Sequence, residues 1–367
     1  MYSYPVPLGE TFDLAQGRVL EPSGQARRLE TVRLIFLGEQ HTDPRSHQAQ
    51  LAVLEQIAAQ GRPLLVALEM FPPAADAVLE EWRSGKLSEA AFLERSRWYE
   101  TWGYPFSHYR SVFTWLRDHR IPLRGINADE ATRAAVRQGQ LESLPPALRA
   151  EVGDLDAVLE PHRDYLLDTL RQAGHRGNLD ADAQDFRRML RVQTLWDRLM
   201  GGRAARLAES QPGNGAVAVL LGSGHLAYRL GANLQAARVT DLAQLSLWDT
   251  TVPRSALDPG GRFPVPVGMA DWVRGYRQEE PQPEYPRLSG IKLAAHAQGV
   301  RVESVRPGPS AYPLQADDVI VALNGAPAGG TAGLRLDFEA LPWDRPAELT
   351  ILRAGKTLTL TVTPHRD

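Results

Sequence analysis

Short runs of hydrophobic residues alternate along the first part of the chain with stretches whose hydrophobic positions recur every three or four residues. Such a run is typical of a buried strand, and the longer spacing is typical of a helix that buries one face. Runs at 34–37, 64–68, 121–126 and 216–221 therefore predict four strands. Their alternation with helices predicts an α/β fold, in which a mainly parallel sheet is flanked by helices.

The chain between the second and fourth predicted strands is mostly helical in pattern and predicts a helical insertion. Helices are expected over 74–83, where Gly85 follows, and after Ser88, whose side chain can cap a helix amino terminus. A longer helix is expected over 183–200, and its hydrophobic face is interpreted as core rather than as a cofactor site. That face consists of Phe186, Met189, Gln193, Trp196 and Met200.

The pattern changes after residue 250. Residues 251–287 are rich in proline and predict a linker with some docked structure. Beyond them, turn signals such as Asn324-Gly325 separate short β-type runs, which predicts a small, mostly β module. The runs lie at 300–305, 319–323, 347–352 and 357–362. We therefore expect an α/β domain over 1–250, a linker over 251–287 and a mostly β domain over 288–367.

A dense group of polar side chains follows the first predicted strand. The chain presents Glu39 and His41 in a turn, and Asp43-Pro44 then opens a helix expected over 44–59. Asp suits the N-cap of a helix and Pro suits its first position. His47, in the first turn, lies on the same face as the leucines of this helix, so its imidazole is expected to face the sheet. Glu39, His41 and His47 are thus predicted to converge.

The other three predicted strands also end in polar residues, namely Glu69, Asn127 and His225. The carboxyl ends of parallel strands lie along one edge of a sheet, where α/β proteins bind ligands. We call this edge the rim and expect Glu39, His41, Glu69 and His225 to form one site there. Asn127 is equally well explained by a role in its turn, and His47 by a role in the core. Asp129 is placed to cap the next helix.

Composition removes several functions. The 41 basic and 44 acidic residues give a formal net charge of −3, so no nucleic-acid or anionic-lipid partner is indicated. There is no cysteine, which excludes disulfides, thiolate metal ligands and a thiol nucleophile. A metal or cofactor must therefore be bound by nitrogen, by oxygen or by a methionine thioether.

No hydrophobic run is long enough to span a bilayer, so no transmembrane segment is expected. The first residues, MYSYPVPLGETFD, lack the basic and hydrophobic regions of a signal peptide. Taken literally, this start predicts a cytoplasmic protein. Removal of a leader would instead place the chain in the cell envelope or periplasm.

Five motifs occur in the order found in the ChaN-like haem-binding uptake family, which is related to the TIKI metalloproteases and the erythromycin esterases. The chain resembles this family over about 12–245, with His47 and Glu69 at matching places. The motifs are GEQH at 38–41, WGYPF at 102–106, GINADE at 125–130, QTLWD at 193–197 and LLGSGH at 220–225.

The resemblance implies that the chain binds haem and takes part in haem or iron uptake. A haem needs an apolar slot, one or two axial ligands and cations near its propionates. The aromatic stretch at 98–109 could supply an apolar wall. The candidate axial ligands are His41, His47, His225, Tyr104 and Tyr109, and Arg110 is a candidate partner for a propionate.

The related enzymes imply an alternative function, that of a metal-dependent hydrolase acting on a peptide or an ester. In this alternative a divalent metal ion would lower the pKa of a bound water, and Glu39 and His41 would be the catalytic residues. The ligands of this metal ion would be Glu39, His41, Glu69 and His225.

The C-terminal segment resembles a PDZ domain of bacterial type. The likeness rests on GVRVESVRPGPSA at 299–311 and ADDVIVALNG at 316–325, although Asp317 stands where glycine is usual. It implies that a peptide or protein carboxyl terminus binds beside Gly290 and Ile291. The sequence leaves the oligomeric state open, with a homodimer as one alternative.

Overall fold

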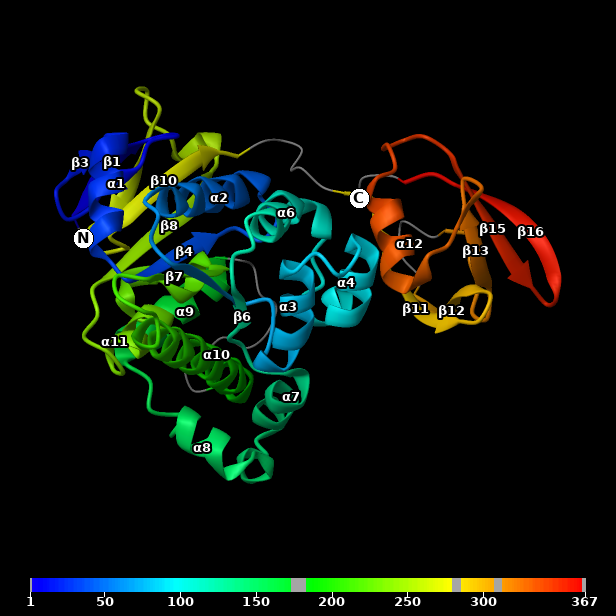
Figure 1. Cartoon of the computed structure of the whole chain (residues 1–367), viewed down its shortest axis with the longest axis horizontal. Coiled ribbons are helices and arrows are strands. Elements are labelled where there is room, and N and C mark those ends of the chain that lie inside the picture. Colours follow the sequence, from blue (N-terminus) through cyan, green and yellow to red (C-terminus); the bar gives the residue numbers. More distant parts are fainter. Residues whose placement is uncertain (1, 173–182, 279–284, 307–311, 365–367) are drawn as a thin grey trace. The chain divides into compact units, whose positions relative to one another are not determined.

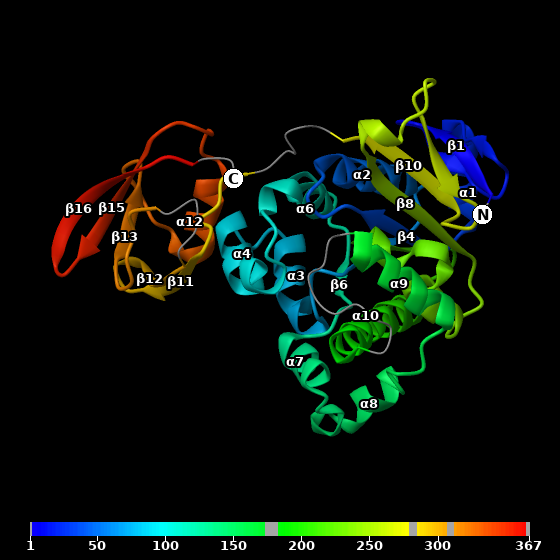
Figure 2. The same cartoon turned by 180° about the vertical axis from the view of Figure 1, so that it is seen from behind.

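The structure is a computed structural model that describes residues 2–172, 183–278, 285–306 and 312–364. The described residues form two units, each with its own hydrophobic core. Unit 1 consists of residues 1–77 and 119–282, and unit 2 consists of residues 78–118 and 283–367. Figures 1 and 2 label the elements of both units.

Unit 1 is built on a mixed sheet whose central strands are buried. Among the described residues the strand order is β3-β2-β10-β8-β4-β7-β5-β6. The strands from β10 to β6 run parallel to their neighbours, whereas β2 and β3 are antiparallel. Their bounds are β3 (Arg18–Val19), β2 (Phe12–Asp13), β10 (Trp272–Arg277), β8 (Gln244–Val252), β4 (Leu34–Glu39), β7 (Ala216–Gly222), β5 (Leu64–Leu68) and β6 (Leu123–Gly125). The four predicted strands are confirmed as β4, β5, β6 and β7.

The sequence did not predict β8 and β10, and it placed β10 in the linker expected over 251–287. In the structure β10 pairs with β8, and β9 (Arg262–Pro266) pairs with β1 (Ser3–Pro7), so residues 262–277 belong to unit 1. Proline is tolerated in β9 because this strand lies in a separate two-stranded sheet, where little of the backbone needs a partner. Residues 279–284 of the expected linker lie outside the described residues.

Helices cover both faces of the sheet (Figure 1). One face packs against α2 (Pro44–Ala59), and the other packs against α10 (Gln184–Glu209) and α11 (Ala232–Ala237), whose alanines join the strand residues in one core cluster. None of the described helices is long and apolar enough to cross a membrane. The remaining helices of unit 1 are α1 (Pro22–Thr31), α7 (Glu130–Gln138), α8 (Pro146–Val152) and α9 (Glu160–Gln172), with the 3₁₀ turns η1 (Pro73–Ala75), η3 (Leu141–Ser143), η4 (Ser223–His225), η5 (Ala227–Arg229) and η6 (Arg254–Ala256).

The predicted helix starts are confirmed by their caps. Asp43 accepts a hydrogen bond from the Arg45 backbone N–H at 3.0 Å, and α2 spans Pro44–Ala59 as expected. Asp129 likewise accepts from the backbone N–H of Thr132 at 2.7 Å. Such bonds satisfy backbone donors that have no partner within the helix.

The C-terminal part of unit 2 is a small antiparallel sheet covered by one described helix. Its strands follow the order β11-β12-β13-β15-β16, with β14 paired to β13. All four predicted runs are strands. The elements are β11 (Ile291–His296), β12 (Gly299–Val305), β13 (Val319–Leu323), β14 (Ala326–Pro327), α12 (Gly330–Glu339), β15 (Ala347–Arg353) and β16 (Lys356–Val362). Residues 307–311 of the PDZ-like motif lie outside the described residues.

The first part of the helical insertion, residues 78–118, forms the rest of unit 2. Its aromatic residues pack on one another, so the stretch at 98–109 is largely core: Trp98 and Phe106 are fully buried, with ring centroids 5.3 Å apart. Ser88 begins α4 by accepting from the Ala91 backbone N–H at 3.3 Å, as predicted. The helices are α3 (Asp76–Arg83), α4 (Glu89–Ser96), α5 (Trp98–Thr101), η2 (Phe106–His108) and α6 (Arg110–Asp118).

Two carboxylates join this insertion to α12. Glu94 of α4 accepts from the Thr331 hydroxyl at 2.9 Å and from the Ala332 backbone N–H at 2.8 Å, at the start of α12. In return, Glu339 at the end of α12 accepts from the Tyr99 hydroxyl at 2.7 Å and from the Ser107 backbone N–H at 3.0 Å. Each segment therefore caps the other, and residues far apart in sequence share one folding unit.

Candidate functional site

The rim forms where the strands β4, β5 and β7 end side by side. The register places Glu39 opposite Gly222, and the backbone N–H of Gly222 donates to Glu69 Oε2 at 2.6 Å. Because β7 lies between β4 and β5, the residues after all three strands come together. The structure thus brings Glu39, His41, Glu69 and His225 to one place, as the sequence predicted.

Glu39 holds the first half of the rim. Its Oε1 lies 2.9 Å from His41 Nδ1 and 3.6 Å from His47 Nε2, and its Oε2 accepts from the Gln50 amide at 2.9 Å. Burial by itself would raise the pKa of Glu39, but the charge of His47 and the hydrogen bond with His41 outweigh it and lower that pKa. Glu39 is therefore a carboxylate that orients His41.

His41 faces outward from this pair and is 28% exposed. Burial acts to lower its pKa, yet the hydrogen bond and charge of Glu39 raise the pKa of His41 above its ordinary value. His47, in the first turn of α2, is fully buried, and its Nε2 lies 3.6 Å from Glu39 Oε1. It supports the site from within the core.

His225 holds the second half of the rim through two carboxylates. Its Nε2 lies 3.2 Å from Glu69 Oε1, and its Nδ1 lies 2.6 Å from Oδ1 of Asp197 in α10. Desolvation would lower the pKa of His225, but the charges of Glu69 and Asp197 raise this pKa to about 10. The imidazole is therefore a buried cation near neutral pH, with both ring nitrogens engaged.

Two glycines are required by close contacts at the rim. A Cβ at Gly222 would lie 2.9 Å from His41 Cε1, and one at Gly231 would lie 2.2 Å from the His225 carbonyl oxygen. Both distances are shorter than ordinary carbon contacts, so a side chain at either position would displace a rim histidine.

A cavity of about 250 Å³ opens beside His41 and His225; we call it the rim cavity. Its other walls are mostly hydrophobic and come from α9 and α10. The lining residues are His41, Tyr165, Leu166, Thr169, Leu170, Phe186, Met189, Leu190, Gln193, Gly222, Gly224 and His225.

The cavity walls differ from the sequence interpretation in two ways. The face of α10 that was interpreted as core is divided: Met200 lies in the core cluster and Phe186 is fully buried, but Phe186, Met189 and Gln193 also line the cavity. Tyr165 of α9 was missed, although the lining positions 165, 166, 169 and 170 have helical spacing. Burial raises the pKa of its phenol, and its ring packs against Tyr228 with centroids 5.6 Å apart.

Three other candidates lie in unit 2. Tyr109 is 1% exposed and packs against Trp98, and the ring of Tyr104 packs against Trp102. Arg110 pairs with Glu89 at 2.9 Å. These side chains are not among the residues that line the rim cavity of unit 1.

The proposed peptide-binding residues also lie at a cavity. Gly290 and Ile291 line a space of about 420 Å³ in unit 2, at the start of β11. The other lining residues are Arg287, Leu288, Ser289, Lys292, Ser304, Arg306 and Arg335. Every charged side chain among these lining residues is therefore basic.

The hydrolase alternative requires a divalent metal ion at the rim. Within the described ranges, no three His, Asp or Glu side chains are grouped so that they could hold one. The hydrolase alternative, with Glu39, His41, Glu69 and His225 as ligands, stays a prediction.

Comparison with known proteins adds a family and a fold. The model of the family described as "Haem-binding uptake, Tiki superfamily, ChaN" matches residues 25–235, more than half of the chain. The structure of cofacial haem binding to ChaN of Campylobacter jejuni is similar, with a TM-score of 0.55 and 15% identity over 73% of this chain and 98% of that one. The two proteins thus share a fold. No curated protein matches the chain.

Two further structures are less similar. A variant of an erythromycin esterase in its open conformation has a TM-score of 0.38 and 13% identity over 74% of this chain and 82% of its own. An HtrA-type protease with a decapeptide has a TM-score of 0.22 and 20% identity over 24% of this chain and 31% of its own. Neither score supports a conclusion about this chain.

Proposed function

The chain belongs to the haem-binding uptake family of the Tiki superfamily (ChaN), so haem is its cofactor, and we propose that it binds this haem at the rim cavity. The observation that carries the proposal is the position of His41, which lines a mostly hydrophobic cavity with its ring held by Glu39. A carboxylate bonded to one imidazole nitrogen fixes the ring and makes the other nitrogen a better metal ligand.

The donor set fits haem. Hydrophobic side chains of α9 and α10 can cover part of a porphyrin face, and His41 can coordinate its iron. His225 suits this role less well, because Glu69 and Asp197 occupy its two ring nitrogens and keep it protonated. Tyr165, which also lines the cavity, has a phenol oxygen that could serve as a further iron ligand. When bound, the haem iron would supply the metal centre that these nitrogen and oxygen donors can ligate.

A haemin titration followed by absorbance tests the site. We expect saturable binding by the wild type, a changed Soret position in His41→Ala, and a smaller change in Tyr165→Phe. The matched control is His296→Ala, which removes an exposed imidazole from unit 2. Spectra that are identical in His41→Ala and in the wild type would exclude His41 as a ligand and reject this site.

We further propose that a second copy of the chain covers the bound haem. The rim cavity, at about 250 Å³, is smaller than typical small-molecule pockets of roughly 300–1,000 Å³, so part of a haem would remain at the surface. Size-exclusion chromatography with and without haemin tests this. A haem-dependent dimer supports the proposal, whereas a haem-loaded monomer contradicts it.

For the C-terminal module we propose binding of a peptide carboxyl terminus beside Gly290 and Ile291. Among the described strands β11 lies at the sheet edge, where an extended peptide can add a strand, and Arg287 and Arg306 stand at its start. A labelled peptide with a free carboxyl terminus should bind more tightly than its amidated form. Arg306→Ala should weaken this binding and Lys356→Ala, on the distant strand β16, should not. Equal binding of the two peptides would contradict the proposal.

A further inference from the structure

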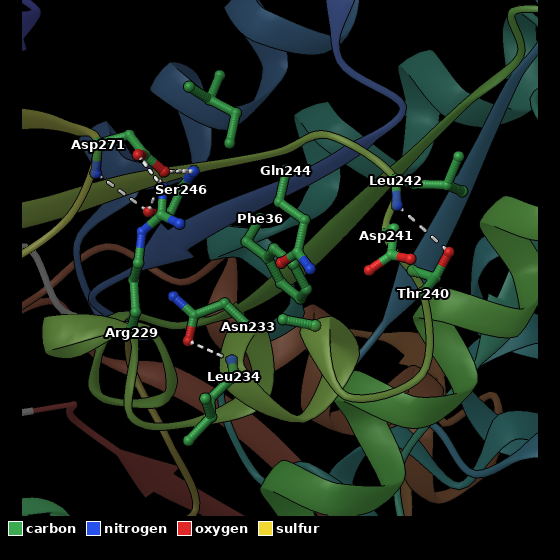
Figure 3. Close-up of a pocket in the computed structure, with 12 residues that line it drawn as sticks. Phe36, Arg229, Asn233, Leu234, Thr240, Asp241, Leu242, Gln244, Ser246 and Asp271 are labelled. Carbon is green, nitrogen blue, oxygen red and sulfur yellow. Dashed lines mark hydrogen bonds and ion pairs between the residues drawn. The ribbon is translucent and has the colours of Figure 1, made fainter.

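Unit 1 contains a second cavity, of about 340 Å³, which we call the α11 cavity (Figure 3). It lies between α11 and the beginning of β8, whereas the rim lies where the strands end. The described residues that line it include none of those that line the rim cavity. They are Phe36, Arg229, Asn233, Leu234, Ala237, Thr240, Asp241, Leu242, Gln244, Leu245, Ser246 and Asp271.

The inner end of the α11 cavity is hydrophobic. Phe36 and Leu245 form its base from the sheet and are almost fully buried, while Leu234 and Ala237 line it from α11. Its volume falls within the range of roughly 300–1,000 Å³ that is usual for small-molecule sites. The base therefore suits a hydrophobic group with a few carbon atoms.

One side of the opening presents an arginine that is paired with an aspartate. Asp271 accepts from the backbone N–H and the hydroxyl of Ser246, each at 2.8 Å, and its other oxygen pairs with Arg229. This arrangement holds the Arg229 guanidinium at the opening, where the side chain is 58% exposed. Its Nε and Nη1 bond to no residue within the described ranges, so they can bind a ligand's anionic group.

The opposite side presents a negative charge. Figure 3 shows Asp241 across the cavity from the Arg229–Asp271 pair, with Phe36 and Gln244 between them. The Asp241 carboxylate is exposed and forms no ion pair with any part of the chain that the structure describes. A ligand would therefore meet opposite charges on the two sides of one hydrophobic space.

The backbone that positions Arg229 is strained. Tyr228 and Arg229 both have left-handed conformations, with φ of 55° and 57°, which residues other than glycine rarely adopt. Surrounding structure must hold two such residues in succession, and the Tyr228 backbone N–H donates to the Met269 carbonyl at 2.8 Å. Strain of this kind concentrates at functional sites.

We propose that the α11 cavity binds a small zwitterion with a hydrophobic body, of the class of free aliphatic α-amino acids. Its carboxylate contacts Arg229, its ammonium group contacts Asp241, and its side chain lies on Phe36 and Leu245. The site is separate from the haem site and does not depend on it.

Isothermal titration with three probes tests the charges separately. L-Leucine carries both charges, 3-methylbutylamine carries only the ammonium group and 4-methylpentanoate only the carboxylate. We expect leucine to bind at least about tenfold more tightly than either analogue, because each charge-assisted contact that is lost weakens binding by that order. Equal affinity for the three probes, or no binding of leucine, would overturn the proposal.

Variants assign the binding to this cavity. Arg229→Gln and Asp241→Asn should each weaken leucine binding at least about tenfold, and Arg238→Gln, an exposed arginine just after α11, should leave it unchanged. All three should titrate with haemin as the wild type does, because their side chains do not line the rim cavity. Leucine binding that survives both cavity variants would place it elsewhere and reject the assignment.

Discussion

His225 Nε2 lies 3.2 Å from Glu69 Oε1, and this contact joins the ends of the neighbouring strands β7 and β5 beneath the rim cavity. The pair is almost completely buried, and Asp197 completes it from the other side of the imidazole. The positively charged His225, which lines the proposed haem site, is therefore fixed between two buried carboxylates.

Replacement of His225 should destabilise the protein. His225→Ala leaves Glu69 and Asp197 buried without their cation, which should lower the free energy of unfolding by about 3–5 kcal/mol at neutral pH. Urea denaturation measures the loss. His296→Ala, which removes an exposed imidazole, is the matched control and should change stability little. A His225→Ala protein as stable as this control would show that the charges do not interact as described.

The same contact predicts a dependence on pH. Because the pKa of His225 is raised from its ordinary value of 6.5 to about 10 in the folded chain, its stabilising effect is complete below pH 6.5. The effect is then lost as the pH rises through 10. The wild type should therefore lose stability relative to His225→Ala between pH 7 and pH 10. Denaturation at several pH values measures the difference, and a constant difference would contradict the raised pKa.

Gly222→Ala should impair haem binding without unfolding the chain. The backbone at Gly222 has φ of −60°, which alanine adopts freely, but its Cβ would lie 2.9 Å from His41 Cε1. His41 is partly exposed and can turn away, so we expect haemin affinity to fall at least about tenfold while stability changes by less than about 1 kcal/mol. Gly329→Ala in unit 2 is the control, because its φ of −84° suits alanine and no described heavy atom would meet its Cβ within 4 Å. Equal affinities of the two variants would contradict the model of the site.

Asp249→Asn should stabilise the protein above neutral pH. Asp249 is buried in β8, and neither carboxyl oxygen has a hydrogen-bond partner among the described residues. Burial raises the pKa of Asp249 well above 3.8, so the unfolded chain loses this proton first and wild-type stability falls as the pH rises above about 4. The variant should lack this slope and be more stable than the wild type at pH 8. Asp241→Asn, which changes an exposed carboxylate, serves as the control in urea denaturation; similar pH profiles for both variants would refute the assignment.

Glu339→Ala should destabilise unit 2. The change removes the acceptor for the Tyr99 hydroxyl and for the backbone N–H and hydroxyl of Ser107, all within 3.0 Å of a buried carboxylate. Unpaired buried donors each cost about 1–3 kcal/mol, so we expect a loss of roughly 2–4 kcal/mol in chemical denaturation. Glu348→Ala, at an exposed position of β15, should cost much less. Equal losses would mean that Glu339 does not join the insertion to α12.

Local patterns in the sequence were sufficient for much of the fold. A strand such as β4 is a continuous hydrophobic run, and the start of α2 depends on Asp43 and its near neighbours, so both are visible within a few residues. The strand β10 was missed, because it contains polar residues and follows a proline-rich stretch. Its place is set by pairing with β8, which no local pattern records.

The sequence alone therefore determined the alternating α/β order, the helix starts and the convergence of Glu39, His41, Glu69 and His225, because parallel strands bring their carboxyl ends together. Only the tertiary structure decided that His225 is a bridged cation and that Tyr165 lines the cavity. These outcomes depend on Asp197 and on helices that pack from distant parts of the chain. Charge pairing and cavity shape are set by contacts across space, whereas caps and hydrophobic periodicity are set by neighbours along the chain.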